Sequence, residues 1–353
     1  MLMRLLRSHL GKFRWLLLGV IVLQAMQSLA TLYLPRLNAD IIDKGIAKGD
    51  TDYIWRTGGL MLGITFVQVL LAVGAVYLGA RTAMGFGRDV RQSLFHTVTG
   101  FSAHEVGELG APSLITRVTN DVQQVQMVVL MTCTLLIAAP ITAVGGVILA
   151  LREDVGLTMI LLVSVPVLLL GVSLVLVRMV PQFRAMQERI DVVNGVLREQ
   201  LIGLRVIRAF VREPYESQRF GDANTDLTET SLIAGRLMAL LSPIVIVVLN
   251  VSSVAAIWIG ASRIADGHLQ IGALIAFLSY LVQILTAVMM ATFMAVMVPR
   301  AAVSAERIQE VLDTPLSIVV AEHPVVDLVE RGTLRLDDVG FRYPGAEDPV
   351  LDG

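Results

Sequence analysis

Six long apolar stretches alternate with polar connections along the chain. Each stretch holds at least the roughly 20 residues that an α-helix needs to cross the hydrocarbon core of a bilayer. A backbone in hydrocarbon must satisfy its own hydrogen bonds, which a helix does. The pattern therefore predicts an all-α membrane protein with six transmembrane helices, at residues 15–34, 57–80, 125–151, 157–177, 237–262 and 271–298.

The connections between these spans differ sharply in length. Only Arg152, Glu153 and Asp154 separate the third and fourth spans, and a short segment around Asp266 separates the fifth and sixth. The connections 81–124 and 178–236 are far longer. Within the second one, apolar residues recur at helical spacing from Asn194 to Phe210. The long connections are therefore predicted to continue the helices beyond the membrane, with one helix over 53–100 about 70 Å long.

Basic residues set the orientation, because Lys and Arg near span ends are retained on the cytoplasmic side. Four precede the first span, and nine arginines fill the second long connection between Arg178 and Arg236. Both termini and both long connections are therefore predicted to be cytoplasmic in a multi-pass protein of the plasma membrane. The 38–52 loop balances two lysines against four aspartates, as an outer loop can.

Composition excludes several classes of protein. Hydrophobic residues make up 55% of the chain and charged residues 16%, so an ordinary soluble enzyme is excluded. The net charge of −2 predicts no nucleic-acid partner. The single Cys133 lies in an apolar run and is interpreted as an inert thiol. The five histidines show no metal-ligand spacing, so neither a metal site nor a catalytic residue is predicted.

The six spans hold no ionisable side chain, which disfavours a proton-driven transporter and a voltage sensor and points to energy supplied from the cytosol. Their polar amides have two interpretations: hydrogen bonds between helices, or a mildly polar lining for an amphipathic substrate. Methionines of the sixth span could repack around varied ligands or simply pack. The candidate cavity residues are Gln24, Gln27, Gln68, Asn250, Gln283, Met290 and Met294.

The sequence changes character after the last span. Residues 300–312 read as a cytosolic helical extension, Pro315 and Pro324 interrupt it, and 333–341 alternates as a β-strand does. The predicted divisions are a cytoplasmic segment 1–14, a transmembrane domain 15–312, a linker 313–332 and the start of a soluble domain 333–353. Some twenty residues are too few to bury a core. We therefore expect the sequence to be a truncated form of a longer protein.

Three stretches resemble a known family. FSAHEVGELGAPSLITRVTNDVQQVQ from Phe101 and GLRVIRAFVREPYESQRF from Gly203 resemble the two intracellular loops of the membrane domain of ABC exporters of the six-helix, half-transporter type. RLDDVGFRYPGAEDPVL from Arg335 resembles the first strand and adenine-stacking loop of their nucleotide-binding domain. The resemblance covers essentially the whole chain. Its Arg-rich, Lys-poor style is similar to that of actinobacterial multidrug or lipid transporters.

The resemblance implies a homo- or heterodimer in membrane lipid, driven by ATP and Mg²⁺ on nucleotide-binding domains, that moves a drug, lipid or peptide-like substrate outward by alternating access. The fourth and fifth helices would cross to the partner. The phosphate-binding run G-x-x-x-x-G-K-[ST] is absent from the 353 residues, so this chain is not expected to hydrolyse ATP itself. An importer of the same fold and a non-transporting scaffold remain alternatives.

The same resemblance assigns roles to individual residues. Two tips, near 104–114 and 210–217, would be the coupling helices that meet the ATPase domains, and Tyr343 would stack on adenine. An ordinary aromatic at a strand end is the alternative for Tyr343. The residues assigned to coupling are His104, Glu105, Gly110, Ser113, Arg117, Asp121, Phe210, Glu213 and Tyr215.

Overall fold

The computed structural model describes residues 1–318, 332, 335–343 and 346–352. Within them, six helices are long and apolar enough to cross a membrane, which confirms the six predicted spans. A short helix α1 (Leu2–Leu10) and a 3₁₀ turn (Gly11–Phe13) lead into α2 (Arg14–Asp40), whose last turns continue as a π-helical segment (Ile41–Ile46). The second span is α3 (Thr51–Thr99), one unbroken helix of 49 residues, as predicted.

The third span is assembled from shorter pieces. Helices α4 (Ala103–Leu109) and α5 (Ala111–Thr116) precede a π-helical turn η3 (Arg117–Asp121) and α6 (Val122–Met131). A second π-helical turn, η4 (Thr132–Leu136), separates α6 from α7 (Ala138–Glu153). The last three spans are long single helices. They are α8 (Val155–Ala209), α9 (Glu213–Ala265) and α10 (Ile271–Asp313).

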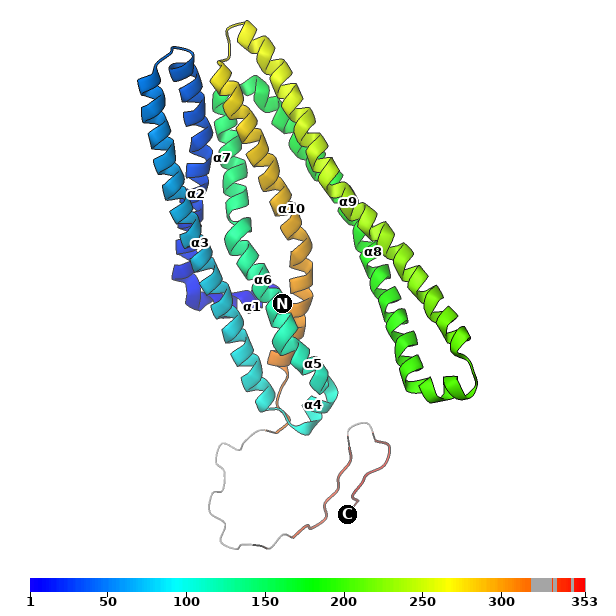
Figure 1. The fold of residues 1–353 in the computed structure, drawn as a ribbon. Helices are drawn as coiled ribbons and strands as arrows, with labels where there is room; N and C mark the ends of the chain where they lie inside the picture. The colour runs from blue at the N-terminus through cyan, green and yellow to red at the C-terminus, as the bar shows by residue number, and fades with distance from the viewer. Residues whose placement is uncertain (319–331, 333–334, 344–345, 353) are drawn as a thin grey trace.

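The helices form two limbs that separate toward one end of the molecule (Figure 1). The first limb contains α1–α7 and α10, and the second is the antiparallel pair α8 and α9. The short turns α7–α8 and α9–α10 lie at the end where the limbs meet. The two long predicted connections lie at the opposite end, where α4 and α5 cap the first limb and the α8–α9 turn caps the second.

Two apolar cores explain why the limbs diverge. One core, with Leu32, Leu157, Phe277 and Tyr280 at its centre, joins α8 to α2, α7 and α10 near the short turns. The other, around Leu5, Phe86, Val122 and Ile308, is built from α1, α3, α6, α10 and their neighbours, and none of its residues belongs to α8 or α9. Apolar burial therefore fixes the second limb to the first at one end only.

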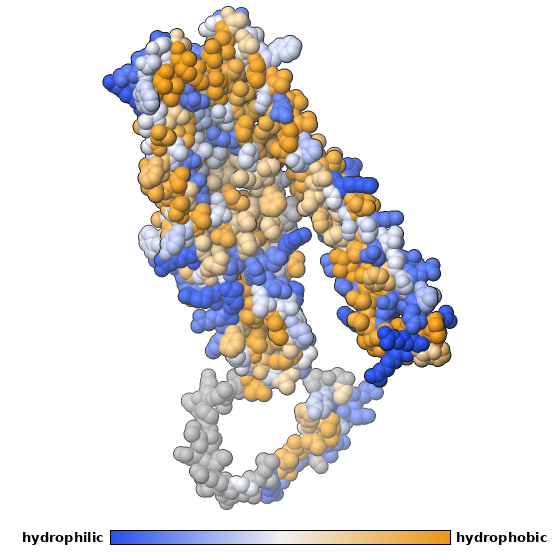
Figure 2. All heavy atoms as spheres, in the orientation of Figure 1, coloured by the Kyte–Doolittle hydropathy of each residue, from blue (hydrophilic) through white to orange (hydrophobic). Residues whose placement is uncertain are grey.

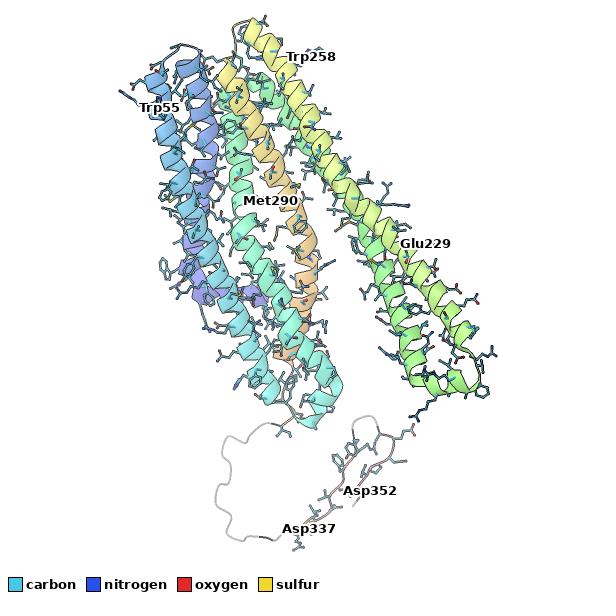
Figure 3. All side chains as sticks on the ribbon, in the orientation of Figure 1. Trp55, Glu229, Trp258, Met290, Asp337 and Asp352 are labelled. Atoms are coloured by element: carbon cyan, nitrogen blue, oxygen red, sulfur yellow. The ribbon has the colours of Figure 1, made fainter. Side chains whose placement is uncertain are left out.

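Two of the three tryptophans lie toward the end with the short turns. Trp55 on α3 and Trp258 on α9 are 82% and 78% exposed and lie toward that end of the bundle (Figure 3). Tryptophan is enriched where a membrane meets water. Hydrophilic side chains gather lower down on both limbs (Figure 2), as the predicted extension of the helices beyond the bilayer requires.

The predicted strand at 333–341 is not observed in the residues that the structure describes. Residues 333–334 lie outside them, and residues 335–343 contain no regular strand. Phe341 and Leu351 form an isolated antiparallel bridge, in which the Phe341 N–H donates to the Leu351 carbonyl at 2.9 Å. The expected start of a soluble domain stays a prediction.

Candidate coupling tips and membrane cavity

The first tip, which we define as residues 101–121, is shaped by a helix cap and a glycine. Ser102 precedes α4 and its hydroxyl accepts a hydrogen bond from the His104 N–H at 3.2 Å. The Ser102 N–H donates in return to Glu105 Oε2 at 2.7 Å, which completes a capping box. Gly110 has φ +76°, a conformation that glycine adopts readily, and turns the chain from α4 into α5.

Glu105 is the buried acidic residue at the centre of the first tip. Its side chain is enclosed, with 3% of the residue exposed. Its second oxygen, Oε1, accepts the N–H of Ser317 at 2.8 Å, in the segment that follows α10. Hydrogen bonds from Ser102 and Ser317 lower the pKa of Glu105 to about 2, because they favour the charged form. Glu105 is therefore ionised at physiological pH.

Two further residues of the first tip pair with α10. Arg117 Nη1 lies 2.8 Å from Glu310 Oε2 and donates to the Arg307 carbonyl at 3.2 Å. Asp121 accepts a hydrogen bond from the Ser304 hydroxyl at 3.1 Å and lies 3.3 Å from Arg307 Nε. Both Arg117 and Asp121 are buried. They hold the first tip against the end of α10.

The second tip, residues 209–215, has a different construction. Helix α8 ends at Ala209 and α9 begins at Glu213, with Val211 in the left-handed region at φ +51°. Phe210 and Val211 are 74% and 76% exposed. The backbone hydrogen bonds of this tip run to residues of α8, as in the Arg212 N–H that donates to the Ile207 carbonyl at 2.9 Å.

Polar contacts close the second limb just behind its tip. Arg219 Nη2 lies 2.6 Å from Glu199 Oε2, and Gln200 donates to the Glu216 carbonyl at 2.9 Å. The Arg212 guanidinium lies 5.8 Å from the centre of the Tyr215 ring, within cation–π range. These contacts keep α8 and α9 together and leave the aromatic groups at the surface.

The residues that the sequence assigns to coupling divide into two sets in the first tip. His104 is exposed and Gly110 and Ser113 are half-buried, so they can meet another protein. Glu105, Arg117 and Asp121 are buried and bonded within the chain. In the second tip Phe210, Glu213 and Tyr215 are all exposed. The structure does not bring the two tips together (Figure 1).

The sequence prediction omitted the residues that bond to the first tip. Only Ser102 had a local signal, because Ser-x-x-Glu before an apolar residue is the signature of a capping box. The partners on α10 and beyond lie some 180 to 210 positions away in the sequence, and their pairing depends on how two helices pack. The omitted residues are Ser102, Ser304, Arg307, Glu310 and Ser317.

The polar amides of the spans occupy several environments. Gln24 on α2 is buried, and its amide donates to the carbonyls of Cys133 and Thr134 at 3.3 and 3.1 Å. Those carbonyls belong to the π-helical turn η4, where the regular helical bonding pattern changes. Gln68 on α3 donates to the Thr31 hydroxyl at 3.0 Å. Gln24 and Gln68 thus make hydrogen bonds between helices.

The other candidate cavity residues lie on three helices. Gln27 on α2 is half-buried, and so is Gln283 on α10, whose carbonyl oxygen is enclosed without a partner among the described residues. Asn250 on α9 is exposed. Met290, halfway along α10 (Figure 3), is 38% exposed, whereas Met294 is 1% exposed. These residues thus range from buried to exposed, and their role as a cavity lining stays a prediction.

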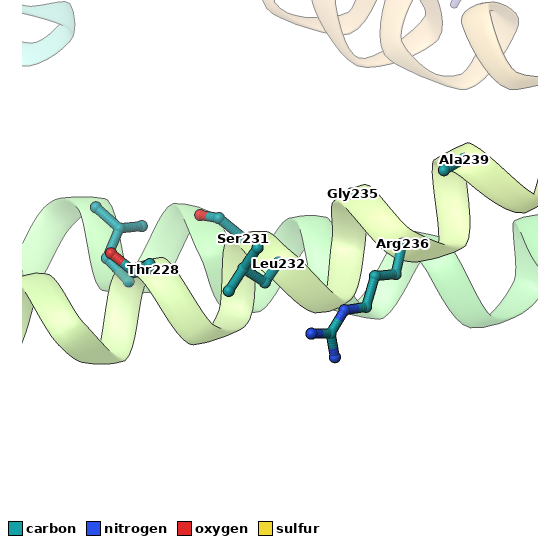
Figure 4. Close-up of a pocket in the computed structure, with 7 residues that line it drawn as sticks. Thr228, Ser231, Leu232, Gly235, Arg236 and Ala239 are labelled. Carbon is teal, nitrogen blue, oxygen red and sulfur yellow. The ribbon is translucent and has the colours of Figure 1, made fainter.

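Two open grooves have none of the candidate cavity residues in their walls. One, of about 710 Å³, runs between α2 and α3 and includes Met26, Tyr33 and Gly63. The other, of about 590 Å³, is lined only by residues 227–239 of α9, including Ser231 and Arg236 (Figure 4). A groove with walls from a single helix is incomplete as a binding site for a small molecule, since such sites bury most of their ligand.

Tyr343 is placed at the surface. It is 60% exposed, and its ring lies edge-on to Phe341 with 4.9 Å between the ring centres. Its stacking on adenine stays a prediction. It offers one aromatic surface and no group for phosphates.

Comparison with known proteins identifies the chain's relatives. Residues 17–288 match the model of the ABC transporter transmembrane region. The chain is 50% identical to an uncharacterized ABC transporter ATP-binding protein of Mycobacterium tuberculosis, over 99% of its own length and 60% of the relative's. This chain therefore spans about three fifths of that relative.

Two more distant relatives have printed functions. The chain is 26% identical to a multidrug efflux ATP-binding/permease protein of Mycobacterium bovis, over 99% of this chain and 29% of that protein. It is 24% identical to an ATP-dependent lipid A-core flippase of Chromobacterium violaceum, over 99% of this chain and 59% of that protein.

Proposed function

This chain belongs to the family of ABC transporter transmembrane regions, and from that membership we propose that it serves a transporter that moves an amphipathic or hydrophobic substrate outward across the plasma membrane. Relatives named for multidrug efflux and lipid A-core flipping support this direction and substrate class. The sequence adds that the spans hold no ionisable side chain to drive transport within the bilayer.

The observation that carries the proposal is the second tip. Phe210, Val211 and Tyr215 expose large apolar or aromatic surface at the end of two helices of 55 and 53 residues. Aromatic anchors of this kind are enriched at protein interfaces. We propose that this tip docks on a nucleotide-binding domain of a second half-transporter, which is either identical or a homologue.

Alternating access follows from this arrangement. Closure of two nucleotide-binding domains would push on both tips, and α3, α8, α9 and α10 would carry the displacement to the membrane as rigid levers. The two limbs share a core near the short turns only, so they can separate or close at the other end. A substrate bound between the limbs would then be exposed alternately to the inside and to the outside.

ATP and Mg²⁺ enter the proposal through the complete transporter. Tyr343 would contribute one stacking surface to adenine. The sequence has no G-x-x-x-x-G-K-[ST] run, so we propose that the phosphates and the metal ion are held by residues outside these 353. When bound, ATP supplies the free energy that changes the relative position of the nucleotide-binding domains.

A deletion in the complete transporter tests the function. Removing residues 104–114 should leave ATP binding intact and abolish substrate transport, because the first tip no longer conveys movement. Transport is measured as uptake into inside-out proteoliposomes, and ATP binding by a fluorescent nucleotide. Continued transport would contradict the coupling role of the tip.

The same assay separates the alternative functions. Substrate leaving inside-out vesicles would identify an importer. ATP hydrolysis that no candidate drug or lipid stimulates, with no movement of substrate, would favour a scaffold.

A further inference from the structure

The segment that leaves α10 is fastened to the first tip of the same subunit. The Ser317 N–H donates to Glu105 Oε1 at 2.8 Å, and the Ser317 hydroxyl lies 2.9 Å from the Ser102 hydroxyl. Ser317 follows the last residue of α10, Asp313, by only four positions. The chain therefore crosses the corner between α3 and α4 immediately after the last helix ends.

Glu105 performs two tasks with its two oxygens. Oε2 completes the cap of α4 through the Ser102 N–H, and Oε1 holds Ser317 from a distant part of the chain. A carboxylate can accept both bonds at once, and charged acceptors make stronger hydrogen bonds than neutral ones. A glutamine would present one oxygen and one NH₂ group, so one of the two backbone donors would lose its acceptor.

Apolar and ionic contacts support the same junction. The Leu316 side chain packs beside Gly100, where an added Cβ atom would lie 3.6 Å from it. Further up α10, the pair Arg117–Glu310 ties that helix to the first tip. A displacement of residue 317 is thus conveyed to α4 directly, as well as through α10.

We propose that Glu105 is a positioning residue for energy coupling: it clasps the linker after α10 onto the first tip, so that a motor domain attached beyond residue 317 moves α4 within its own subunit. This inference rests on the proposed function. The clasp would let the first tip be moved by the motor domain of its own subunit, without docking on the partner. It would also give a role to the buried carboxylate of Glu105, which faces no substrate.

The experiment uses the complete transporter and two readouts. Hydrogen exchange at the Ser317 amide reports on the clasp, and substrate transported per ATP hydrolysed reports on coupling. Glu105→Gln should raise the exchange rate at residue 317 by about tenfold, the scale of one charged hydrogen bond, and lower the transport-to-hydrolysis ratio severalfold. Glu108→Gln, an exposed acid on the same helix, should change neither readout.

A second pair of variants tests the clasp while keeping Ser102 and Glu105, the two side chains that cap α4. Ser317→Pro removes the donating N–H and should reproduce the loss of coupling, whereas Ser317→Ala keeps that N–H and should retain most of it. Unchanged exchange in Glu105→Gln, or faster exchange with an unchanged transport ratio, would overturn the inference. If the unmodified transporter moved no substrate, the proposed function would fail and the exchange data would still test the clasp itself.

Discussion

The two tips at the divided end of the molecule have opposite constructions. The first is bonded to α10 and the segment after it through buried Glu105, Arg117 and Asp121. The second exposes Phe210 and Val211 at the turn between α8 and α9. The first tip thus makes buried polar contacts within the subunit, whereas the second presents large apolar side chains at the surface. The predictions below test that difference.

The largest effect is expected from Arg307→Ala. It removes the charged neighbour of buried Asp121, which would keep only the Ser304 hydroxyl, and an under-satisfied buried charge costs about 2 kcal/mol. Thermal unfolding of the detergent-solubilised transporter should show a clearly lower Tm. The control is Arg208→Ala, which changes an exposed residue of α8 near the second tip. It should leave the Tm nearly unchanged. Equal Tm values for both variants would refute the difference between the tips.

Phe210→Ala should leave stability unchanged and weaken coupling. The ring is exposed, so the Tm should hold, while docking of the second tip should weaken by about 2 kcal/mol, as for an aromatic anchor in an interface. The readout is substrate-stimulated ATP hydrolysis. Leu201→Ala changes an exposed residue of α8 two to three turns before the second tip and should retain stimulation. If both variants lost substrate-stimulated ATP hydrolysis, the docking surface would include α8 around Leu201 as well as the tip.

A smaller loss is expected from Ser102→Ala. The cap of α4 loses its hydroxyl acceptor for the His104 N–H, and such a loss costs about 1 kcal/mol. Ser113→Ala, which removes a hydroxyl with no hydrogen bond among the described residues, should cost less. Chemical unfolding followed by tryptophan fluorescence would measure both. A greater loss for Ser113→Ala would show that α5, rather than the cap of α4, holds the first tip.

The smallest effect within the usual pH range concerns Glu105. Its pKa falls from an ordinary value of 4.5 to about 2, so the stability it adds is fully present above pH 4.5 and is lost as the pH falls toward 2. The difference in Tm between the unmodified protein and Glu105→Gln should be constant from pH 8 to 5. It should shrink only in more acidic buffer. A difference that changes between pH 6 and 8 would exclude Glu105 as its source.

The sequence predicted the membrane helices well because hydrocarbon imposes length and apolarity on each span independently. The continuation of the helices beyond the membrane was also predicted, from the helical spacing of apolar residues over 194–210 for α8. Gln24 shows the limit of this reasoning. Its sequence position allowed either a cavity lining or an interhelical bond, and the hydrogen bonds to Cys133 and Thr134 depend on a π-helical turn that no composition rule specifies.

The candidate site was predicted unevenly for the same reason. Phe210 and Tyr215 were assigned to a tip because the stretch from Gly203 resembles an intracellular loop of the family, and they are exposed there. Arg117 and Asp121 were assigned to the same kind of contact, yet their charges meet Glu310 and Arg307 on α10. These pairs depend on how α10 packs against a segment nearly 190 residues earlier in the chain. That packing cannot be predicted from a single sequence.

The most direct test of the difference between the tips is photo-crosslinking from position 211 in the complete transporter. A photoreactive amino acid in place of Val211, followed by mass spectrometry of the products, identifies what the second tip touches. The account predicts adducts that join two polypeptides. Adducts confined to α8 and α9 of the same chain would show that the exposed tip docks on nothing and would contradict the account.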